Sequence, residues 1–240
     1  MEKLLILFVL MLPQNSFKET QLKNVRVKTA FTEKEEIVRG YFMAKRLKYE
    51  GFHLFIRGFK KEQKLEIWTR EADKETYSLL RVYDFCAVSG TLGPKRKEGD
   101  CQIPEGIYSI NHFNPLSSFY LSLGINYPNA SDQILSDPKT PGSSIYIHGN
   151  CVTIGCIPLT DDKIKELYVL AVEARNNGQE KIPVHIFPTR LSVSELNELK
   201  ATFPIKTITF WDNLRLVYDD FEKSKAIRPV RVTRSGEYAL

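Results

Sequence analysis

The chain has 240 residues, which is long enough for a single domain to bury a substantial hydrophobic core. With 42% hydrophobic and 26% charged residues, it is too apolar for a disordered chain and too charged for a protein with many membrane spans. The net charge is +5, and the basic residues are not gathered into one block, which argues against nucleic acid as a partner. Four cysteines are too few for a disulfide-stapled scaffold, so another role has to be considered for at least some of them.

Residues 1–16 are predicted to be a secretory signal peptide. Lys3 precedes an unbroken apolar run over 4–12, which is much shorter than the roughly 20 residues of a transmembrane helix. A buried N-terminal helix or strand is the alternative. We expect the mature chain, 17–240, to be a single domain without a membrane span that is secreted, periplasmic or associated with the cell wall.

The first half of the mature chain predicts a helix followed by strands. Apolar residues recur at helical spacing over 26–49, and Thr32 with Glu35 resembles a capping box. Short alternating runs then predict antiparallel strands, and a Gly-, Pro- and Lys-rich stretch predicts a long loop. The strands are expected at 53–60, 64–69 and 77–83, and the loop at 90–106. In that loop Lys95, Arg96 and Lys97 favour a solvated surface, with contact to an anionic wall polymer as the alternative.

The second half mixes strands and helices. A helix capped by Asp161 or Asp162 carries one apolar stripe and ends near Asn177. Further strands are expected at 106–111, 119–123, 144–148 and 182–187, further helices at 192–202 and 211–223, and a hairpin at 230–238. This order predicts an α+β fold with a mixed β-sheet core, an N-terminal helix and a C-terminal helical extension.

Reactive residues are concentrated in the segment 143–162. His148 ends an apolar strand, and Cys156 follows Gly155 shortly before a predicted helix start. A cysteine near a helix N-terminus gains thiolate character, and a histidine within reach can take its proton and return it. The N–H groups of Gly155 and Cys156 are candidates to stabilise an oxyanion. These residues predict a cysteine-dependent acyl-transfer enzyme.

Other interpretations of the same residues stay open. A histidine that ends an apolar strand is often a half-buried structural residue, and Cys151 with Cys156 could form a disulfide. A zinc site of His148, Cys151 and Cys156 lacks a second ligand cluster, so no metal is expected. A disulfide between Cys86 and Cys101 closes a plausible loop, although pairing cannot be deduced from sequence. Without a phosphate-cradling loop or nucleotide fingerprint, no cofactor is expected.

An ordered set of short motifs adds a resemblance. It comprises His148-Gly149, Thr153-x-Gly155-Cys156, Gly93-Pro-Lys, Pro104-Glu-Gly106-x-Tyr108 and Asn126-Tyr-Pro-Asn129. With these motifs the chain resembles the L,D-transpeptidase (YkuD-like) catalytic domain, and in particular its YafK-like murein transpeptidase branch, whose His-to-Cys interval is short.

The resemblance implies roles for individual residues. Cys156 is implied as the nucleophile that forms a thioester, and His148 as the general base and acid. The carbonyl of Gly149 is implied to orient the imidazole, and the N–H groups of Gly155 and Cys156 to bind the oxyanion. Side chains expected to line the substrate pocket, with packing or turn formation as their alternative, are those of Tyr146, Asn150 and Thr153.

The resemblance also implies a substrate. It is a peptidoglycan stem peptide, cut at the L-centre of diaminopimelate, with a second stem peptide or a wall-attached protein as further partner. Two positions depart from the family pattern, because Ile154 replaces its second histidine and Pro158 replaces a polar residue. Hydrolysis on the same fold therefore stays open, as does a non-catalytic wall-binding domain in which Cys151 and Cys156 are bridged.

Overall fold

The computed structural model describes residues 16–240. The predicted signal peptide therefore lies outside the described residues, apart from Ser16. That residue is the N-cap of helix α1 (Phe17–Leu22) and forms a capping box with Glu19. Across residues 16–240, no helix combines the length and the apolar character needed to cross a membrane.

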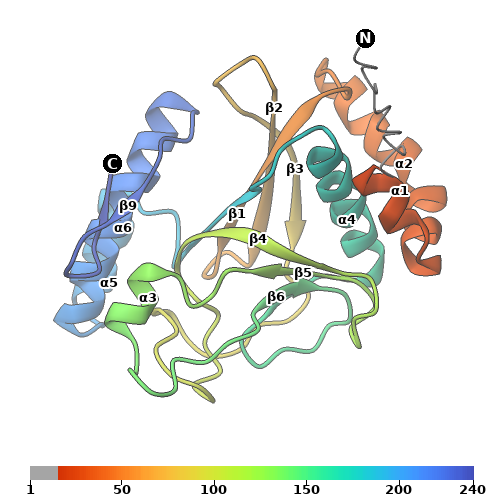
Figure 1. The fold of residues 1–240 in the computed structure, drawn as a ribbon. Coiled ribbons are helices and arrows are strands. Elements are labelled where there is room, and N and C mark those ends of the chain that lie inside the picture. The colour runs from red at the N-terminus through yellow and green to blue at the C-terminus, as the bar shows by residue number, and fades with distance from the viewer. Residues whose placement is uncertain (1–15) are drawn as a thin grey trace, which may run out of the picture.

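Eight strands form one mixed sheet in the order β3-β2-β1-β8-β4-β5-β6-β7. Neighbours pair antiparallel except for β1 with β8 and β6 with β7, which are parallel. Figure 1 shows β4 and β5 running across the direction of β1 to β3, so the sheet is strongly curled. The strands are β1 (Phe52–Phe59), β2 (Lys64–Glu71), β3 (Ser78–Asp84), β4 (Gly106–Asn114), β5 (Ser122–Ile125), β6 (Tyr146–His148), β7 (Ile157–Pro158) and β8 (Pro183–Phe187).

The helices lie on both sides of this sheet. In Figure 1, α1, α2 and α4 gather on one side, whereas α5, α6 and the C-terminal hairpin gather on the other. The remaining elements are α2 (Val25–Lys45), α3 (Ala130–Leu135), α4 (Asp161–Asn176), α5 (Val193–Lys200), α6 (Ile205–Ser224), and the hairpin of β9 (Arg231–Val232) and β10 (Tyr238–Ala239). The predicted α+β class with a mixed sheet and flanking helices is confirmed.

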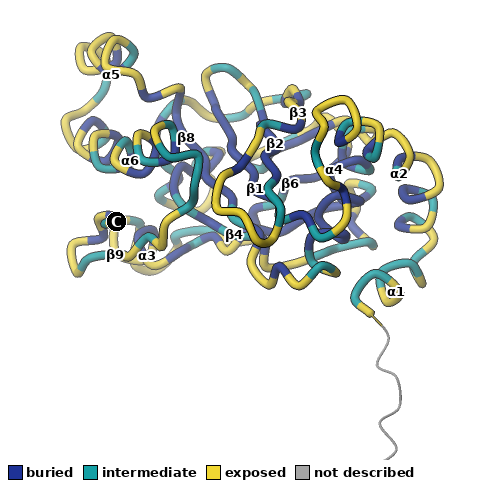
Figure 2. The backbone as a smooth tube through the Cα atoms, turned by 90° about the horizontal axis from the view of Figure 1, so that it is seen from above, coloured by how far each residue is buried: buried dark blue, intermediate teal, exposed yellow. Residues whose placement is uncertain are grey.

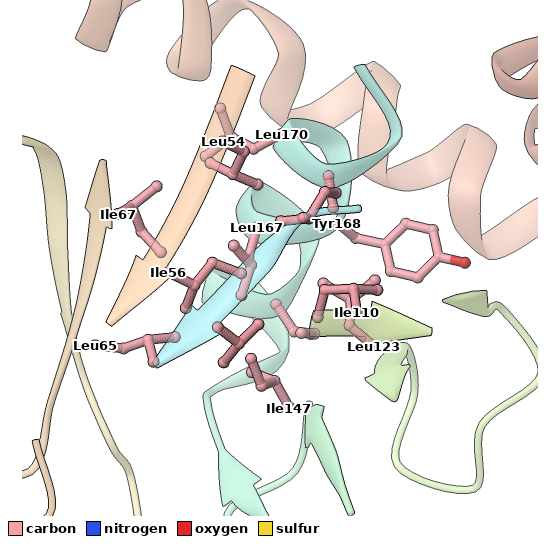
Figure 3. Close-up of a cluster of buried hydrophobic side chains, with 14 of the residues drawn as sticks. Leu54, Ile56, Leu65, Ile67, Ile110, Leu123, Ile147, Leu167, Tyr168 and Leu170 are labelled. Atoms are coloured by element: carbon pink, nitrogen blue, oxygen red, sulfur yellow. The ribbon is translucent and has the colours of Figure 1, made fainter. Parts of the chain in front are cut away.

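Strand β1 shows why helices cover both faces. Its side chains alternate, so Leu54 and Ile56 point to the α4 side, whereas Phe55 and Phe59 point to the α6 side. Figure 3 shows the first of these clusters, in which Leu54 and Ile56 meet Leu167 of α4. Because both faces are covered, nearly the whole strand is buried, as the dark blue of β1 in Figure 2 shows.

Several predictions about boundaries and caps fail. The cap of α4 is Thr160, whose side chain accepts the N–H of Lys163, and not Asp161 or Asp162. The first long helix begins at Val25, because the Asn24 side chain accepts the N–H of Arg26, so Thr32 is not its cap. No helix was expected between the strands at 119–123 and 144–148, but the short helix α3 lies there and is capped by Asn129. The last helix begins six residues before the predicted Trp211, directly after Pro204, which fixes a dihedral compatible with a helix start.

A buried ion pair fastens the long loop before β4 to the sheet. Lys60 Nζ lies 3.0 Å from Glu105 Oε1 and also donates to the carbonyl of Gly93 at 2.7 Å. The other oxygen of Glu105 accepts the indole N–H of Trp211 at 2.6 Å. Glu105 is fully buried, and these partners replace the water that its charge gives up.

Removing Glu105 should therefore be costly. The Glu105→Ala variant leaves the Lys60 ammonium buried without its partner, and we expect it to lose about 3–5 kcal/mol of unfolding free energy in urea titration. The control is Asp84→Asn, which breaks the surface pair with Lys64 and should cost about 0–1 kcal/mol. Equal losses in the two variants would contradict the importance of the buried pair.

Candidate active site

A cleft of about 680 Å³ opens beside the β5–β6 edge of the sheet. Its walls come from strands β4 to β6, the segment 152–156 before β7, and the long loop that precedes β4. The residues that line it include both members of the expected catalytic pair. The lining residues that bear on the chemistry are Lys95, Cys101, Asn114, Phe119, Ser122, Ser144, Tyr146, His148, Thr153, Gly155 and Cys156.

Strand register sets the floor of this cleft. His148 of β6 pairs with Ser122 of β5, which pairs in turn with Asn114 of β4. Residues in register on neighbouring strands share one face of a sheet. The three side chains therefore form a row across the sheet, and all three line the cleft.

Cys156 reaches the same face through the parallel pairing of β6 and β7. Ile157 pairs with Ile147, so Cys156 lies beside Tyr146, two residues from His148 along β6. Strand spacing of about 4.8 Å and a rise of about 6.6 Å for two residues place the Cα atoms of Cys156 and His148 about 8 Å apart. Both residues line the same cleft.

The imidazole of His148 is held by its own chain. Its Nδ1 lies 2.5 Å from the carbonyl oxygen of Gly149, and because a carbonyl can only accept, Nδ1 carries the proton. The lone pair is therefore on Nε2, which is the form that a general base requires. Phe119 packs against the ring at a centroid distance of 4.6 Å. Burial lowers the pKa of His148, against the opposing effect of its hydrogen bond to Gly149.

Burial also governs the thiol of Cys156. It raises the pKa of Cys156, whereas a backbone hydrogen bond from Tyr146 and the charge of Lys95 lower it. The expected activation by a helix N-terminus is wrong, because α4 begins only at Asp161 and β7 lies in between. The hydrogen bond of Sγ is a long one of 3.9 Å to the carbonyl of Ser144. Both shifts favour a neutral thiol on Cys156 and a neutral imidazole on His148.

The expected oxyanion donors are engaged within the chain. The N–H groups of Gly155 and Cys156 both donate to Oγ1 of Thr153, at 3.1 and 2.8 Å. The hydroxyl of Thr153 donates in turn to the carbonyl of Cys156 at 2.8 Å. The two N–H groups therefore converge on one point, which the Thr153 hydroxyl occupies in this structure.

The cysteines pair in neither of the two ways that the sequence left open. Cys86 forms a disulfide with Cys151, so the pairings of Cys86 with Cys101 and of Cys151 with Cys156 are both wrong. The physical reason is that the Cys86 N–H bonds to the carbonyl of Pro158, which places it beside the segment that joins β6 to β7. Cys101 and Cys156 are free thiols, and both line the cleft.

The structure separates the three side chains that were expected to line the substrate pocket. Tyr146 and Thr153 line the cleft, whereas Asn150 adopts a positive φ of 62° and lines a neighbouring cavity. Sequence reasoning missed Ser122 and Asn114, because only strand register places them beside His148. Within the described part of the chain, no group of three or more His, Cys, Asp or Glu side chains is arranged to hold a metal ion.

The neutral resting pair predicts a particular pH dependence. Since burial raises the pKa of Cys156, its alkylation by iodoacetamide should keep accelerating with pH beyond the ordinary thiol value of 9.0. The measurement uses Cys101→Ala protein, so that Cys156 is the thiol that reacts. A plateau of reactivity at pH 5–8 that His148→Ala abolishes would instead indicate a thiolate–imidazolium pair.

Known proteins resemble this chain in sequence. The family described as YkuD, the L,D-transpeptidase catalytic domain, matches residues 55–186. The Escherichia coli K12 protein named "Putative L,D-transpeptidase YafK" is 34% identical over 192 residues, which cover 79% of this chain and 74% of that protein. The protein of the same name from Escherichia coli O157:H7 matches with the same values.

Two solved structures show more distant similarity. The helical cell shape determining protein Pgp2 from Campylobacter jejuni gives a TM-score of 0.45 at 16% identity, covering 76% of this chain and 73% of its own. Bd1075 of Bdellovibrio bacteriovorus gives 0.40 at 24%, covering 72% and 61%. The family match and the alignment with YafK each span more than half of the chain, which therefore belongs to the L,D-transpeptidase catalytic domain family.

Proposed function

We propose that this protein is a cysteine-dependent L,D-transpeptidase that acts on peptidoglycan stem peptides. The observation that carries the proposal is the free thiol of Cys156 beside a buried, oriented His148 in one cleft of about 680 Å³. A cleft of this size accommodates a short peptide segment. The disulfide of Cys151 with Cys86 supports the same proposal, since it leaves Cys156 unpaired.

The first step is formation of a thioester. Nε2 of His148 takes the proton of the Cys156 thiol as Sγ attacks the carbonyl carbon at the L-centre of diaminopimelate. The electron pair of the C=O bond moves to its oxygen and gives an oxyanion. When the C–N bond breaks, the imidazolium returns its proton to the leaving amine, which departs as D-alanine.

Stabilisation of the oxyanion requires a local rearrangement of the chain. The N–H groups of Gly155 and Cys156 already point to one place, but they donate to Thr153 Oγ1. A rotation of the Thr153 side chain would release both donors to the substrate oxygen. Donors of this kind are worth about 10²–10³ in turnover when they are aimed at the oxyanion.

The second step decides the class of reaction. An acceptor amine from another stem peptide attacks the thioester and gives a cross-link, and a wall-attached protein with a free amine is a second acceptor of the same chemistry. Water as acceptor gives hydrolysis and a tripeptide. We propose amine transfer as the principal reaction in the cell wall, which requires export of the chain by its predicted signal peptide.

Incubation with disaccharide tetrapeptide tests the proposal. We expect the wild-type protein to release D-alanine and form cross-linked dimers, which liquid chromatography and mass spectrometry resolve. Cys156→Ala should reduce both products to background, because the nucleophile is lost. Tripeptide without dimer would identify water as the acceptor.

The control for that experiment is Cys101→Ala. It removes the other free thiol of the cleft and keeps the proposed nucleophile. Undiminished release of D-alanine by Cys156→Ala, or its loss in Cys101→Ala alone, would contradict the assignment of Cys156.

A further inference from the structure

One buried cation faces the cleft. Among the described residues that line the cleft, Lys95 is the single Lys or Arg, and it is only 5% exposed. The sequence favours a solvated surface for Lys95, Arg96 and Lys97. The structure separates them, because Arg96 pairs with Asp132 and Lys97 is exposed, whereas Lys95 turns inward.

The chain holds the Lys95 ammonium in place. Its Nζ donates to Asp100 Oδ1 at 2.6 Å and to the carbonyl of Lys97 at 3.0 Å. Gly142, with a φ of +91°, packs directly against it, since a Cβ there would lie 2.8 Å from Cε of Lys95. An ammonium has three N–H donors, and these two hydrogen bonds leave the third for a ligand.

The neighbouring carboxylate is shared between Lys95 and the backbone of the loop. Asp100 accepts the backbone N–H groups of Arg96, Lys97 and Gln102 at 2.8, 3.0 and 3.0 Å, in addition to Lys95. These donors stabilise the carboxylate together with Lys95, so it does not depend on the ammonium alone. Lys95 also lies near enough to Cys156 for its charge to lower the pKa of the thiol.

The proposed substrate needs such a cation. A stem tetrapeptide carries a free carboxylate on its terminal D-residue and another at the far centre of diaminopimelate, both within a few bonds of the scissile amide. Pro158, in register with His148 on β7, supplies no charge there. We propose that Lys95 is a specificity-determining residue that binds a free substrate carboxylate beside Cys156. This inference rests on the proposed function and adds the group that recognises the substrate.

Amidated substrates test the inference. The wild-type protein and Lys95→Met are assayed with three tetrapeptides, namely the free acid, the terminal carboxamide, and the carboxamide at the far centre of diaminopimelate. Wild-type kcat/KM should fall about 10- to 100-fold for the one carboxamide that removes the bound carboxylate, as expected for a hydrogen bond between charged groups. Which of the two carboxamides is affected identifies the carboxylate. In Lys95→Met the free acid and that carboxamide should react equally.

Two variants separate recognition from support of the loop. Lys95→Arg keeps a cation and should retain the preference for the free acid. Asp100→Asn weakens the loop but keeps the ammonium, so it should lower turnover of all three peptides by one factor.

The contradicting results are distinct from failure of the proposed function. If the wild-type protein turns over all three peptides equally, Lys95 does not bind a substrate carboxylate. This conclusion holds even if Lys95→Met does not fold. A uniform loss in Lys95→Met would assign it to loop support alone. Absence of turnover of any peptide by the wild-type protein would overturn the proposed function, and this inference with it.

Discussion

The parallel pairing of β6 with β7 is the constraint on which the site depends. Parallel neighbours usually need a crossover of a dozen or more residues, but here only residues 149–156 connect them. This tight connection brings Cys156 back beside the strand that ends at His148. The disulfide from Cys151 to Cys86 fastens the middle of the connection to the segment after β3. Gly155, with a φ of +139°, lets the chain pass close to the carbonyl of Gln102, where a Cβ would lie 3.1 Å away.

Burial around this connection defines the electrostatics of the cleft. It favours the neutral forms of both Cys156 and His148, which are the proposed catalytic pair. The negative charge of the proposed mechanism appears only during the reaction. Lys95, held by Asp100, is then the positive charge nearest to that event among the described lining residues. The Lys60–Glu105 pair anchors the loop that carries Lys95 and Cys101.

The sequence predicted those features that depend on local pattern. Alternating apolar residues located β1 to β3, and the apolar stripe located α4, because each pattern reports which side of an element is buried. The motif around His148 and Cys156 also indicated the family, because its residues lie close together in the chain.

Features that depend on distant parts of the chain could not be predicted. The partner of Cys86 follows from the folded position of the β6–β7 connection, and Ser122 joins His148 only through strand register. Lys95 looked like a surface residue because Asp100 and Gly142, which bury it, are recognisable only in the fold. The Thr153 hydroxyl accepts the N–H groups of Gly155 and Cys156 because of its side-chain rotamer, which composition and spacing do not determine.

Covalent trapping of the acyl-enzyme tests the central claim most directly. The wild-type protein is quenched in acid soon after mixing with a stem tetrapeptide, and its intact mass is compared with that of the free protein. The account predicts an added mass equal to the tetrapeptide minus D-alanine, mapped to the peptide that contains Cys156 and absent from Cys156→Ala. An adduct on Cys101, or turnover without any adduct on Cys156 under conditions that preserve thioesters, would contradict it.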